Sequence, residues 1–382
     1  MTLEASLPLG SEQQIPKHER LRKYLLGELS EGRLKPGDAL PTEQELTVSG
    51  QMSRNTVRQA LADLERSGLI RRIPGRGTFV HESAMLRLKS GIDVFALVIP
   101  ETRTGYYPSL QRGFHEASER LNNQVIVCDT NNDPNRQAAA LLQLMDKEVA
   151  GIALVPTTVP ETPRYQVRPL HQRGIPVVFC HRRVEGIQAP LVTFSAIEVG
   201  RMAGRALLKH GHQRVAFFSH TRGGLTPQYL QGFRGVLEDG GAAVPEPFVC
   251  CDDTSVFSTE HEEVVRRNLQ QIMQGGKRPT AIFCTFDPEA EVVFFELATM
   301  GIKVPGDVSL VGFGGRWRES AIARRLVSVT VDEEKLACQT VKILDEMRRR
   351  ERPLDDTSEV TMDLELSTGE TLSAPAGYTQ RH

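Results

Sequence analysis

The sequence predicts an α/β protein with a small helical N-terminal region and a larger region of alternating strands and helices. Three observations support this fold class. Three amphipathic segments precede two short β-like runs within the first 80 residues, and residues 52–80 concentrate six arginines against two acids. From residue 93 onward, short apolar runs alternate with helical segments. Residues 82–92, between the two regions, are polar without periodicity and are interpreted as a linker.

Length and composition limit the class of protein. A chain of 382 residues with net charge −2 is long enough for two or three domains of ~100–200 residues. The first residues lack the basic and apolar segments of a secretory signal, and no apolar run approaches the ~18 residues that span a membrane. The six cysteines are scattered without CxxC spacing, which indicates free thiols. We therefore expect a cytoplasmic protein.

The N-terminal region has the element order of a winged helix-turn-helix. Leucines at helical spacing predict a first helix from about Lys17 to Glu31. Thr42 is placed to cap a second, short helix, with Glu45 completing a capping box, and Ser53 is placed to cap a third. Two short β segments then surround the glycine-rich residues 74–77. The inward face of the third helix is predicted to consist of Val57, Ala60, Leu61 and Leu64.

The third helix would be the recognition helix, since such a helix enters the major groove with its N-terminal turns. Arginine reads guanine and asparagine suits adenine, while the glycines of the hairpin let the backbone approach the duplex closely. The alternative interpretation, a solvated basic face, is typical of an isolated charge run. The predicted DNA-binding residues are Thr42, Gln44, Ser53, Arg54, Asn55, Thr56, Arg58, Arg72, Gly75, Arg76 and Gly77.

The stretches LKPGDALPTEQEL, SRNTVRQALADLERSGLI and GRGTFV resemble the GntR family of bacterial transcription regulators over about 65 residues. The resemblance implies that Arg54, Thr56, Arg58 and Gly75 contact DNA. It also implies a departure at Gln44, where family members often carry arginine, so that a phosphate contact would be weakened or replaced by a neutral one. The predicted DNA-binding domain spans residues 14–81.

The remaining region is predicted to form two parallel sheets. Runs such as DVFALVIP and AIFCTF are typical of buried strands, and each is followed by a helical segment. Strands that alternate with helices form parallel sheets with right-handed crossovers, and about 290 residues is more than one sheet needs. Because open parallel sheets bind ligands at the carboxyl ends of their strands, two facing lobes would share a site in the cleft between them.

The stretches GHQRVAFFSH, QGFRGVLEDGG, MGIKVPGDVSLVGF and VSVTVDEEKLACQTVKIL resemble the effector domain of LacI/GalR regulators. The resemblance implies a periplasmic-binding-protein-like domain over residues 93–375, built as two parallel α/β sandwiches joined by a hinge. Lobe 1 would hold about residues 93–190 and 329–352, and lobe 2 about 191–328 and 357–375. GntR-type DNA-binding domains joined to such a domain form a subgroup that includes arabinose-responsive repressors.

The same resemblance implies cleft positions, several of which lack the polar groups that hold sugar hydroxyls. Tyr229 stands at an arginine position, Phe286 at an asparagine position, and Gly314 and His181 at aspartate positions. The expected effector-binding residues are Tyr106, Tyr107, His181, Arg182, Tyr229, Phe286, Asp287, Gly314 and Trp317. We expect a flatter, more apolar or aromatic ligand in place of a standard sugar. Two alternatives stay open: these side chains fill the cleft without a ligand, and Trp317 packs on the surface.

These features predict a homodimeric transcription regulator, expected to be a repressor, that binds double-stranded operator DNA at two-fold related half-sites and responds to a small-molecule effector. The alternative is a ligand-independent dimeric DNA-binding protein whose C-terminal domain serves only dimerisation. We expect no enzyme, no membrane partner, no cofactor and no metal. Lys277 is followed by Arg278 and not by Ser or Thr, so no phosphate loop is complete. His210 and His212 lie too close together, and no third ligand follows at a spacing typical of a metal site.

Overall fold

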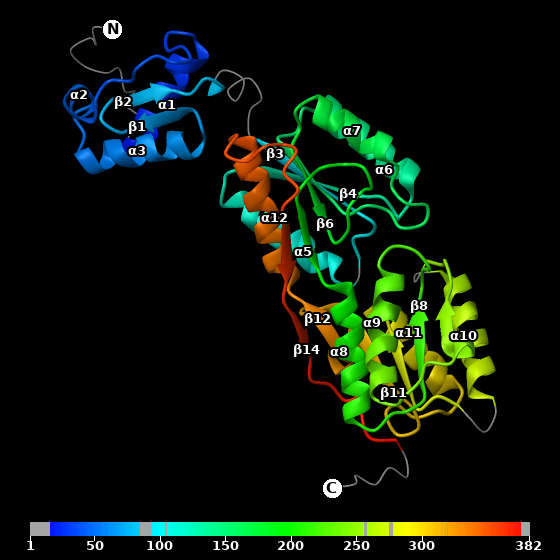
Figure 1. Ribbon diagram of the computed structural model, residues 1–382. Coiled ribbons are helices and arrows are strands. Elements are labelled where there is room, and N and C mark those ends of the chain that lie inside the picture. The colour runs from blue at the N-terminus through cyan, green and yellow to red at the C-terminus, as the bar shows by residue number, and fades with distance from the viewer. Residues whose placement is uncertain are drawn as a thin grey trace. The chain divides into compact units, whose positions relative to one another are not determined.

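The computed structural model describes residues 16–84, 93–103, 105–255, 258–274, 278–318 and 320–375. The chain divides into two compact units, which Figure 1 shows as ribbons coloured along the sequence. The first unit holds Met1–Val94 with Ser118–Gln124, and the second holds Phe95–Ala117 with Val125–His382. Most of the predicted linker, residues 85–92, lies outside the described residues. Within the described ranges, no helix is both long enough and apolar enough to cross a membrane.

The first unit has the predicted order of three helices and a hairpin. Helices α1 (Lys17–Ser30), α2 (Glu43–Ser49) and α3 (Arg54–Arg66) precede strands β1 (Ile70–Ile73) and β2 (Gly77–Val80). The two strands pair antiparallel, with Ile70 opposite Val80. This arrangement confirms the winged helix-turn-helix.

Local side-chain chemistry explains where these helices begin. The Thr42 hydroxyl accepts the backbone N–H of Glu45 while the Glu45 carboxylate accepts that of Thr42, so the capping box is complete. The Ser53 hydroxyl accepts the backbone N–H of Thr56 at 3.1 Å and so caps α3. The four predicted inward residues of α3, Val57, Ala60, Leu61 and Leu64, are all buried in the core with leucines of α1 and α2.

The second unit contains two six-stranded sheets. The first has the strand order β13-β7-β6-β5-β3-β4. Its strands are β3 (Val94–Ile99), β4 (Gln124–Asp129), β5 (Gly151–Leu154), β6 (Val177–Cys180), β7 (Leu191–Phe194) and β13 (Glu359–Met362). The helices of this part are α5 (Tyr107–Glu119), α6 (Pro134–Asp146), α7 (Arg164–Gln172) and α12 (Glu333–Arg348). Helix α12 packs against β5, β6 and β7.

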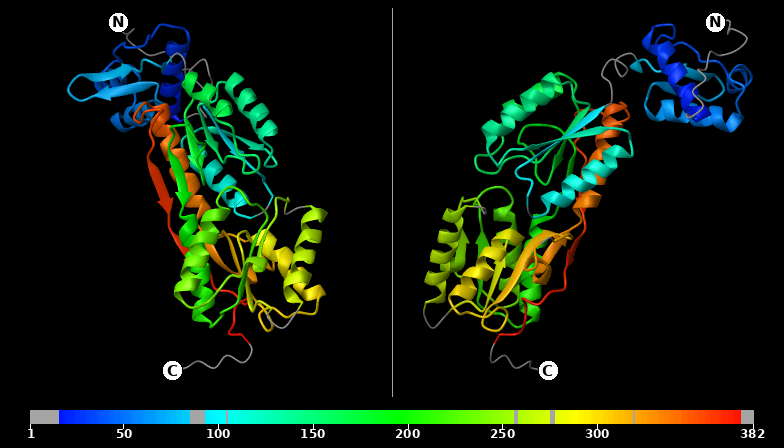
Figure 2. Two further views of the ribbon diagram at one scale, coloured as in Figure 1. Left: turned by 45° about the vertical axis from the view of Figure 1, so that its right-hand side comes forward. Right: turned by 180° about the vertical axis from the view of Figure 1, so that it is seen from behind.

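The second sheet has the order β14-β12-β11-β10-β8-β9, with β14 antiparallel to β12. Its strands are β8 (Val215–Ser219), β9 (Val249–Cys251), β10 (Ala281–Cys284), β11 (Ser309–Gly315), β12 (Val327–Val331) and β14 (Leu364–Leu366). The associated helices are α8 (Ala196–Lys209), α9 (Thr226–Asp239), α10 (Thr259–Met273) and α11 (Asp287–Thr299), and two 3-10 turns cover Glu246–Phe248 and Ala323–Arg325. Two sheets with flanking helices confirm the predicted pair of α/β lobes (Figure 2).

The limits of the two lobes differ from the predicted ones. Strands β7 and β13 were expected in lobe 2 but hydrogen-bond within the sheet of lobe 1, whereas β12 belongs wholly to the sheet of lobe 2. The chain therefore crosses between lobes after β7, after β12 and between β13 and β14. An apolar run predicts a buried strand but does not identify the strand with which it pairs, because pairing is decided by residues far away in the chain.

Candidate nucleic-acid interface and effector cleft

The outer face of α3 carries exposed polar side chains over its first turns. Arg54, Asn55 and Arg58 are exposed, whereas Val57 in the same turns is buried. Thr56 is half-buried, and its hydroxyl lies 2.8 Å from that of Ser53, so these two hydroxyls belong to the cap of the helix. The face therefore presents two guanidinium groups and one amide, the groups that bind phosphates and base edges.

The hairpin presents a second basic element. Arg76 donates its backbone N–H to the carbonyl of Ile73 at 3.0 Å, which closes a type II turn with Pro74 second and Gly75 third. Gly75 has φ +72°, the left-handed value that this turn requires at its third position. Arg76 is exposed at the tip, and no ion pair of Arg76 or Arg54 occurs within the residues that the structure describes.

Glu43 of α2 connects the recognition helix to the hairpin, and sequence reasoning missed it. Its carboxylate pairs with Arg58 Nε at 2.9 Å and lies 3.9 Å from Arg72 Nη2. Arg72 also pairs with Glu65 at 3.3 Å. One carboxylate thus touches side chains of α3 and β1, so the helix and the hairpin share a surface. The available signal was the position of an acid directly after the cap residue Thr42, in the first turn of α2.

The other predicted contacts on α2 differ in their surroundings. Thr42 is exposed, but its hydroxyl is occupied by the capping box with Glu45. Gln44, one residue into the helix, is exposed. Of these two side chains, Gln44 is the one available to a phosphate oxygen.

The second unit contains a cavity of about 300 Å³ at the carboxyl ends of strands from both sheets. Its lining comes from the segments that follow β3, β4, β5 and β6 in the first lobe, and from those that follow β8, β9 and β10 in the second. Five of the nine predicted effector residues line it: Tyr106, Tyr107, Arg182, Tyr229 and Phe286. The cleft is therefore located where parallel sheets bind ligands.

Aromatic rings meet across this cleft. The centroids of Tyr106 in lobe 1 and Phe286 in lobe 2 are 5.6 Å apart in an edge-on arrangement. Phe313 of β11 lies 5.0 Å from Phe194 of β7 and 5.6 Å from Tyr229. A Cβ atom on Gly105, whose φ is +67°, would overlap the Phe286 ring. The rings thus hold the two lobes together, at distances typical of stabilising aromatic pairs.

Arg182 is a guanidinium without a carboxylate partner. Neighbouring Arg183 pairs with Glu359 at 3.5 Å, whereas Arg182 forms no ion pair within the described ranges, and its Nε is buried without a hydrogen-bond partner. Its positive charge opposes the effect of burial, which raises the pKa of Tyr107 and Tyr229. Arg182 therefore supplies positive charge to the wall of the cleft.

Two histidines near Arg182 are uncharged at neutral pH. Burial, with a smaller effect of Arg182, lowers the pKa of His181 to about 3. Burial also lowers the pKa of His220 to about 4, and neighbouring His261 acts in the same direction. His220 lines the cavity, but His181 is only 1% exposed and meets the Tyr106 ring edge-on, with the ring centroids 4.9 Å apart. His181 is thus a buried support of the aromatic wall.

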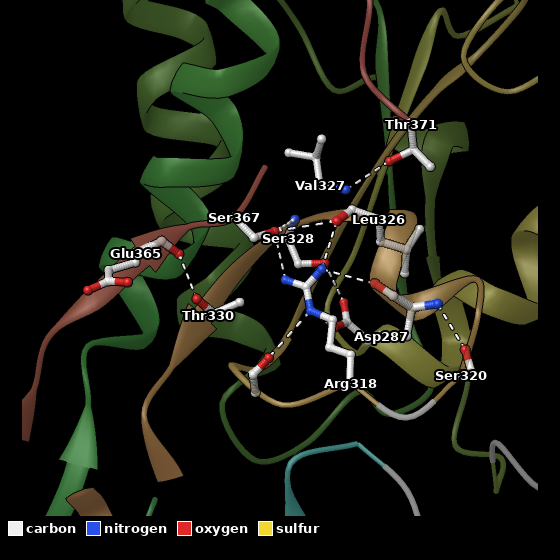
Figure 3. Close-up of polar contacts among 12 residues, drawn as sticks. Asp287, Arg318, Ser320, Leu326, Val327, Ser328, Thr330, Glu365, Ser367 and Thr371 are labelled. Atoms are coloured by element: carbon white, nitrogen blue, oxygen red, sulfur yellow. Dashed lines mark hydrogen bonds and ion pairs between the residues drawn. The ribbon is translucent and has the colours of Figure 1, made fainter. Parts of the chain in front are cut away.

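Asp287 and Gly314 lie beneath the cleft. Asp287 is buried, accepts a hydrogen bond from the Ser328 hydroxyl at 2.7 Å and lies 3.6 Å from Arg318 Nε (Figure 3). A side chain on Gly314 would overlap the Asp287 carboxylate, which explains why glycine occupies this position. We expected both residues to contact the effector, and the structure instead assigns them to a buried polar cluster in lobe 2.

Trp317 also lies away from the cavity. Its side chain is 56% exposed, and the Arg112 guanidinium lies 5.0 Å from the ring centroid. It borders a separate hollow with Arg316, Arg324 and Glu365. This placement supports the surface-packing alternative for Trp317, because the side chain is exposed and does not line the cavity. The position of Trp317 shortly after a strand end was compatible with either alternative.

The cavity includes polar residues that sequence reasoning did not identify. Glu101, Asn131, Asn132, His220 and Asp253 follow strand ends and line the cavity. Their positions directly after the apolar runs of β3, β4, β8 and β9 were the available signal, because strand ends form the site in this kind of sheet.

Comparison with known proteins finds a matching family model in each unit. Residues 17–80 match the model for bacterial regulatory proteins of the gntR family. Residues 205–372 match the model for a periplasmic binding protein-like domain. The first matched segment coincides with the winged helix-turn-helix, and the other covers most of the second lobe together with α12 and β13 of the first lobe.

One of the curated relatives matches nearly the whole chain, and others match part of it. The chain is 28% identical over 360 residues to the arabinose metabolism transcriptional repressor of Geobacillus stearothermophilus, covering 93% of this chain and 97% of that protein. It is 27% identical over 227 residues to the HTH-type transcriptional repressor PurR of Proteus mirabilis, covering 58% and 63%. The crystal structure of transcription regulator CcpA of Lactococcus lactis superimposes with a TM-score of 0.62 at 17% identity, over 74% of this chain and 99% of that one.

Proposed function

Because the chain is a transcriptional regulator that joins a gntR-family DNA-binding domain to a periplasmic-binding-protein-like domain, we propose that it represses transcription by binding an operator and releases or tightens that binding when a small molecule enters the cleft. An effector acts in this way only if it binds the two states of the protein with different affinity. The same proposal includes that the protein is cytoplasmic, forms a homodimer and catalyses no reaction.

The surface shared by α3 and the hairpin supports the DNA-binding half of the proposal. Arg54 and Arg76 are exposed guanidinium groups that form no ion pair with any described residue, and Glu43 holds Arg58 and Arg72 on the same surface. We assign base reading to the first turn of α3 and phosphate contact to the hairpin, because a recognition helix enters the major groove by its N-terminal turns. A homodimer would read two half-sites related by two-fold symmetry.

The experiment starts with selection of binding sites from randomised duplex DNA by the full chain, followed by gel-shift titration. Arg54→Ala and Arg58→Ala should each weaken binding to the selected site about 10- to 100-fold, as expected for loss of a bidentate base contact. Arg66→Ala is the matched control, because Arg66 is an exposed arginine at the far end of the same helix and pairs only with Asp63. Unchanged affinity of both test variants, with folded protein by circular dichroism, would exclude this surface.

One observation favours the alternative of a ligand-independent dimeric DNA-binding protein. The Tyr106 and Phe286 rings contact each other across the cleft, so the two lobes are in contact there without a bound ligand. A thermal-shift screen of the full chain against sugars, polyols, nucleosides and aromatic acids separates the two functions. Stabilisation by one class, together with a changed operator affinity, supports the effector-controlled repressor. Absence of any effect favours the alternative.

A further inference from the structure

The composition of the cleft restricts the chemistry of its ligand. Arg182 is the only lysine or arginine among the described residues that line the cavity, and His220 there is neutral because burial lowers its pKa to about 4. The Arg182 charge has no carboxylate partner among the residues that the structure describes. A half-buried guanidinium without a counter-charge favours a ligand that brings its own anion.

The walls around Arg182 are aromatic. Tyr106 and Tyr107 extend from the start of α5, Tyr229 from α9 and Phe286 from the start of α11, and all four side chains are at most 8% exposed. Their rings form contacts of 4.7–5.6 Å with one another or with the supporting rings of His181 and Phe313. Rings held in this way offer flat apolar surface, which suits an aromatic ring and leaves a polyhydroxylated sugar ring with few partners.

The rim of the cavity carries hydrogen-bond acceptors. Asp253 accepts the backbone N–H of Arg222 at 2.7 Å and the Thr221 hydroxyl at 3.2 Å through the same oxygen, Oδ1. Glu101 accepts the backbone N–H of Arg103 at 2.9 Å through Oε2. These carboxylates repel a second anion, so the ligand has a single acidic group and presents to the rim a donor such as a hydroxyl group.

From the charge, the rings and the volume together, we propose that the cleft binds a small hydroxylated aromatic carboxylate. Its carboxylate pairs with Arg182, its ring lies among Tyr106, Tyr229 and Phe286, and its hydroxyl group faces the acceptors of the rim. The cavity of about 300 Å³ is at the lower end of ligand sites, which limits the ligand to one or two rings. This inference rests on the proposed function, since it specifies the effector of the same cleft.

The test measures binding to the full chain by isothermal titration calorimetry with four probes. 4-Hydroxybenzoate carries both the ring and the charge. 4-Hydroxybenzamide keeps the ring without the charge, cyclohexanecarboxylate keeps the charge without the aromatic ring, and L-arabinose has neither. We expect 4-hydroxybenzoate to saturate one site per chain and each of the other three to bind at least about 10-fold more weakly, because each lacks a contact worth about one charged hydrogen bond or aromatic pair.

Variants assign the binding to the cleft. Arg182→Gln should weaken 4-hydroxybenzoate about 10- to 100-fold and remove its advantage over 4-hydroxybenzamide. Arg173→Gln, an exposed arginine of the same lobe that lies 3.7 Å from Asp146, controls for the general loss of positive charge and should leave binding unchanged. Equal weakening by the two variants would overturn the pairing with Arg182.

The outcomes separate this inference from the proposed function. No saturation by 4-hydroxybenzoate at about 10 mM, a concentration that fills a site with a Kd of about 1 mM, overturns the ligand class. Tighter binding of L-arabinose also overturns it, while leaving an effector-controlled repressor in place. The gel shift with Arg54→Ala and Arg58→Ala is performed without any ligand, so its result decides DNA binding independently of the cleft.

Discussion

Arg318 offers a direct test of how the second lobe is held together. Its side chain is 7% exposed and donates to the carbonyls of Ala323 at 3.0 Å and Leu326 at 2.7 Å, and to the Ser367 hydroxyl at 2.7 Å (Figure 3). Its Nε lies 3.6 Å from the Asp287 carboxylate. Ser367 follows β14, so these contacts fasten the last crossing segment to β12.

Arg318→Met removes all these donors while keeping a long apolar side chain. The Asp287 carboxylate loses its counter-charge, and breaking a buried pair on one side typically costs about 3–5 kcal/mol. Arg316→Met is the matched control. Arg316 lies two residues away and pairs with Asp332 and Glu365 near the surface, where such pairs contribute at most about 1 kcal/mol.

The assay is equilibrium urea unfolding followed by fluorescence of Trp317, the single tryptophan of the chain, with circular dichroism as the second probe. The double variant Arg318→Met, Asp287→Asn should lose less stability than the two single variants combined, because the buried negative charge is gone. A loss below about 1 kcal/mol for Arg318→Met, or strict additivity in the double variant, would refute the assigned role of the pair.

The cost of Arg318→Met should also depend on pH. Burial raises the pKa of Asp287 to about 6 although Arg318 opposes the shift, so removal of Arg318 should raise this pKa further. A raised acid pKa means that the folded state prefers the protonated carboxyl, and the resulting stability is complete below the unfolded pKa of 3.8 and lost as pH rises through about 6. The destabilisation of the variant should therefore shrink from pH 7.5 toward pH 4.

Three further predictions concern other parts of the molecule. His181→Phe should reduce the loss of stability between pH 7 and pH 5 by about 2 kcal/mol in urea titrations. The pKa of His181 is about 3 in the folded state and 6.5 in the unfolded state, so only the unfolded state takes up a proton in this range. Equal pH profiles of the variant and the parent protein would contradict this prediction. Gly105→Ala should lower the thermal midpoint, since φ +67° costs about 1 kcal/mol for alanine and its Cβ overlaps Phe286, and the added substitution Phe286→Ala should recover only the part due to overlap. Ser53→Ala should lower the free energy of unfolding of the first unit by about 1 kcal/mol, because the N–H of Thr56 loses its acceptor. A change smaller than about 0.3 kcal/mol would contradict the capping role of the hydroxyl.

Much of the DNA-binding surface could be predicted from the sequence because its determinants are local. Capping side chains lie three residues from the groups that they bind, and the exposed face of a helix follows from its apolar period. Glu43 was missed because its partners Arg58 and Arg72 are 15 and 29 positions further along the chain. The specific DNA contacts and the limits of the DNA-binding domain remain predictions, and the gel-shift variants address the contacts.

The cleft was predicted less completely than the DNA-binding surface. The resemblance to LacI/GalR regulators indicated the strand ends that form it, and five of nine expected residues line the cavity. Asp287 and Gly314 lie instead in the buried cluster with Arg318, which depends on side chains from separate segments of the second sheet. Whether the residues that line the cavity bind an effector stays a prediction.

The sequence by itself determined the local elements of this protein: the capped helices of the first unit, its glycine-tipped hairpin, and the alternation of buried strands with helices in the second. Periodicity, caps and turns act over a few residues, so they can be predicted without knowledge of the tertiary structure. Only the tertiary structure decided that β7 and β13 join the first sheet and β12 the second. It also decided that aromatic rings meet across the cleft, and that Arg182 lines it without an ion pair to any described residue. These features depend on which segments, distant in sequence, come into contact. Those contacts determine which strands pair and how far a charged side chain is removed from water.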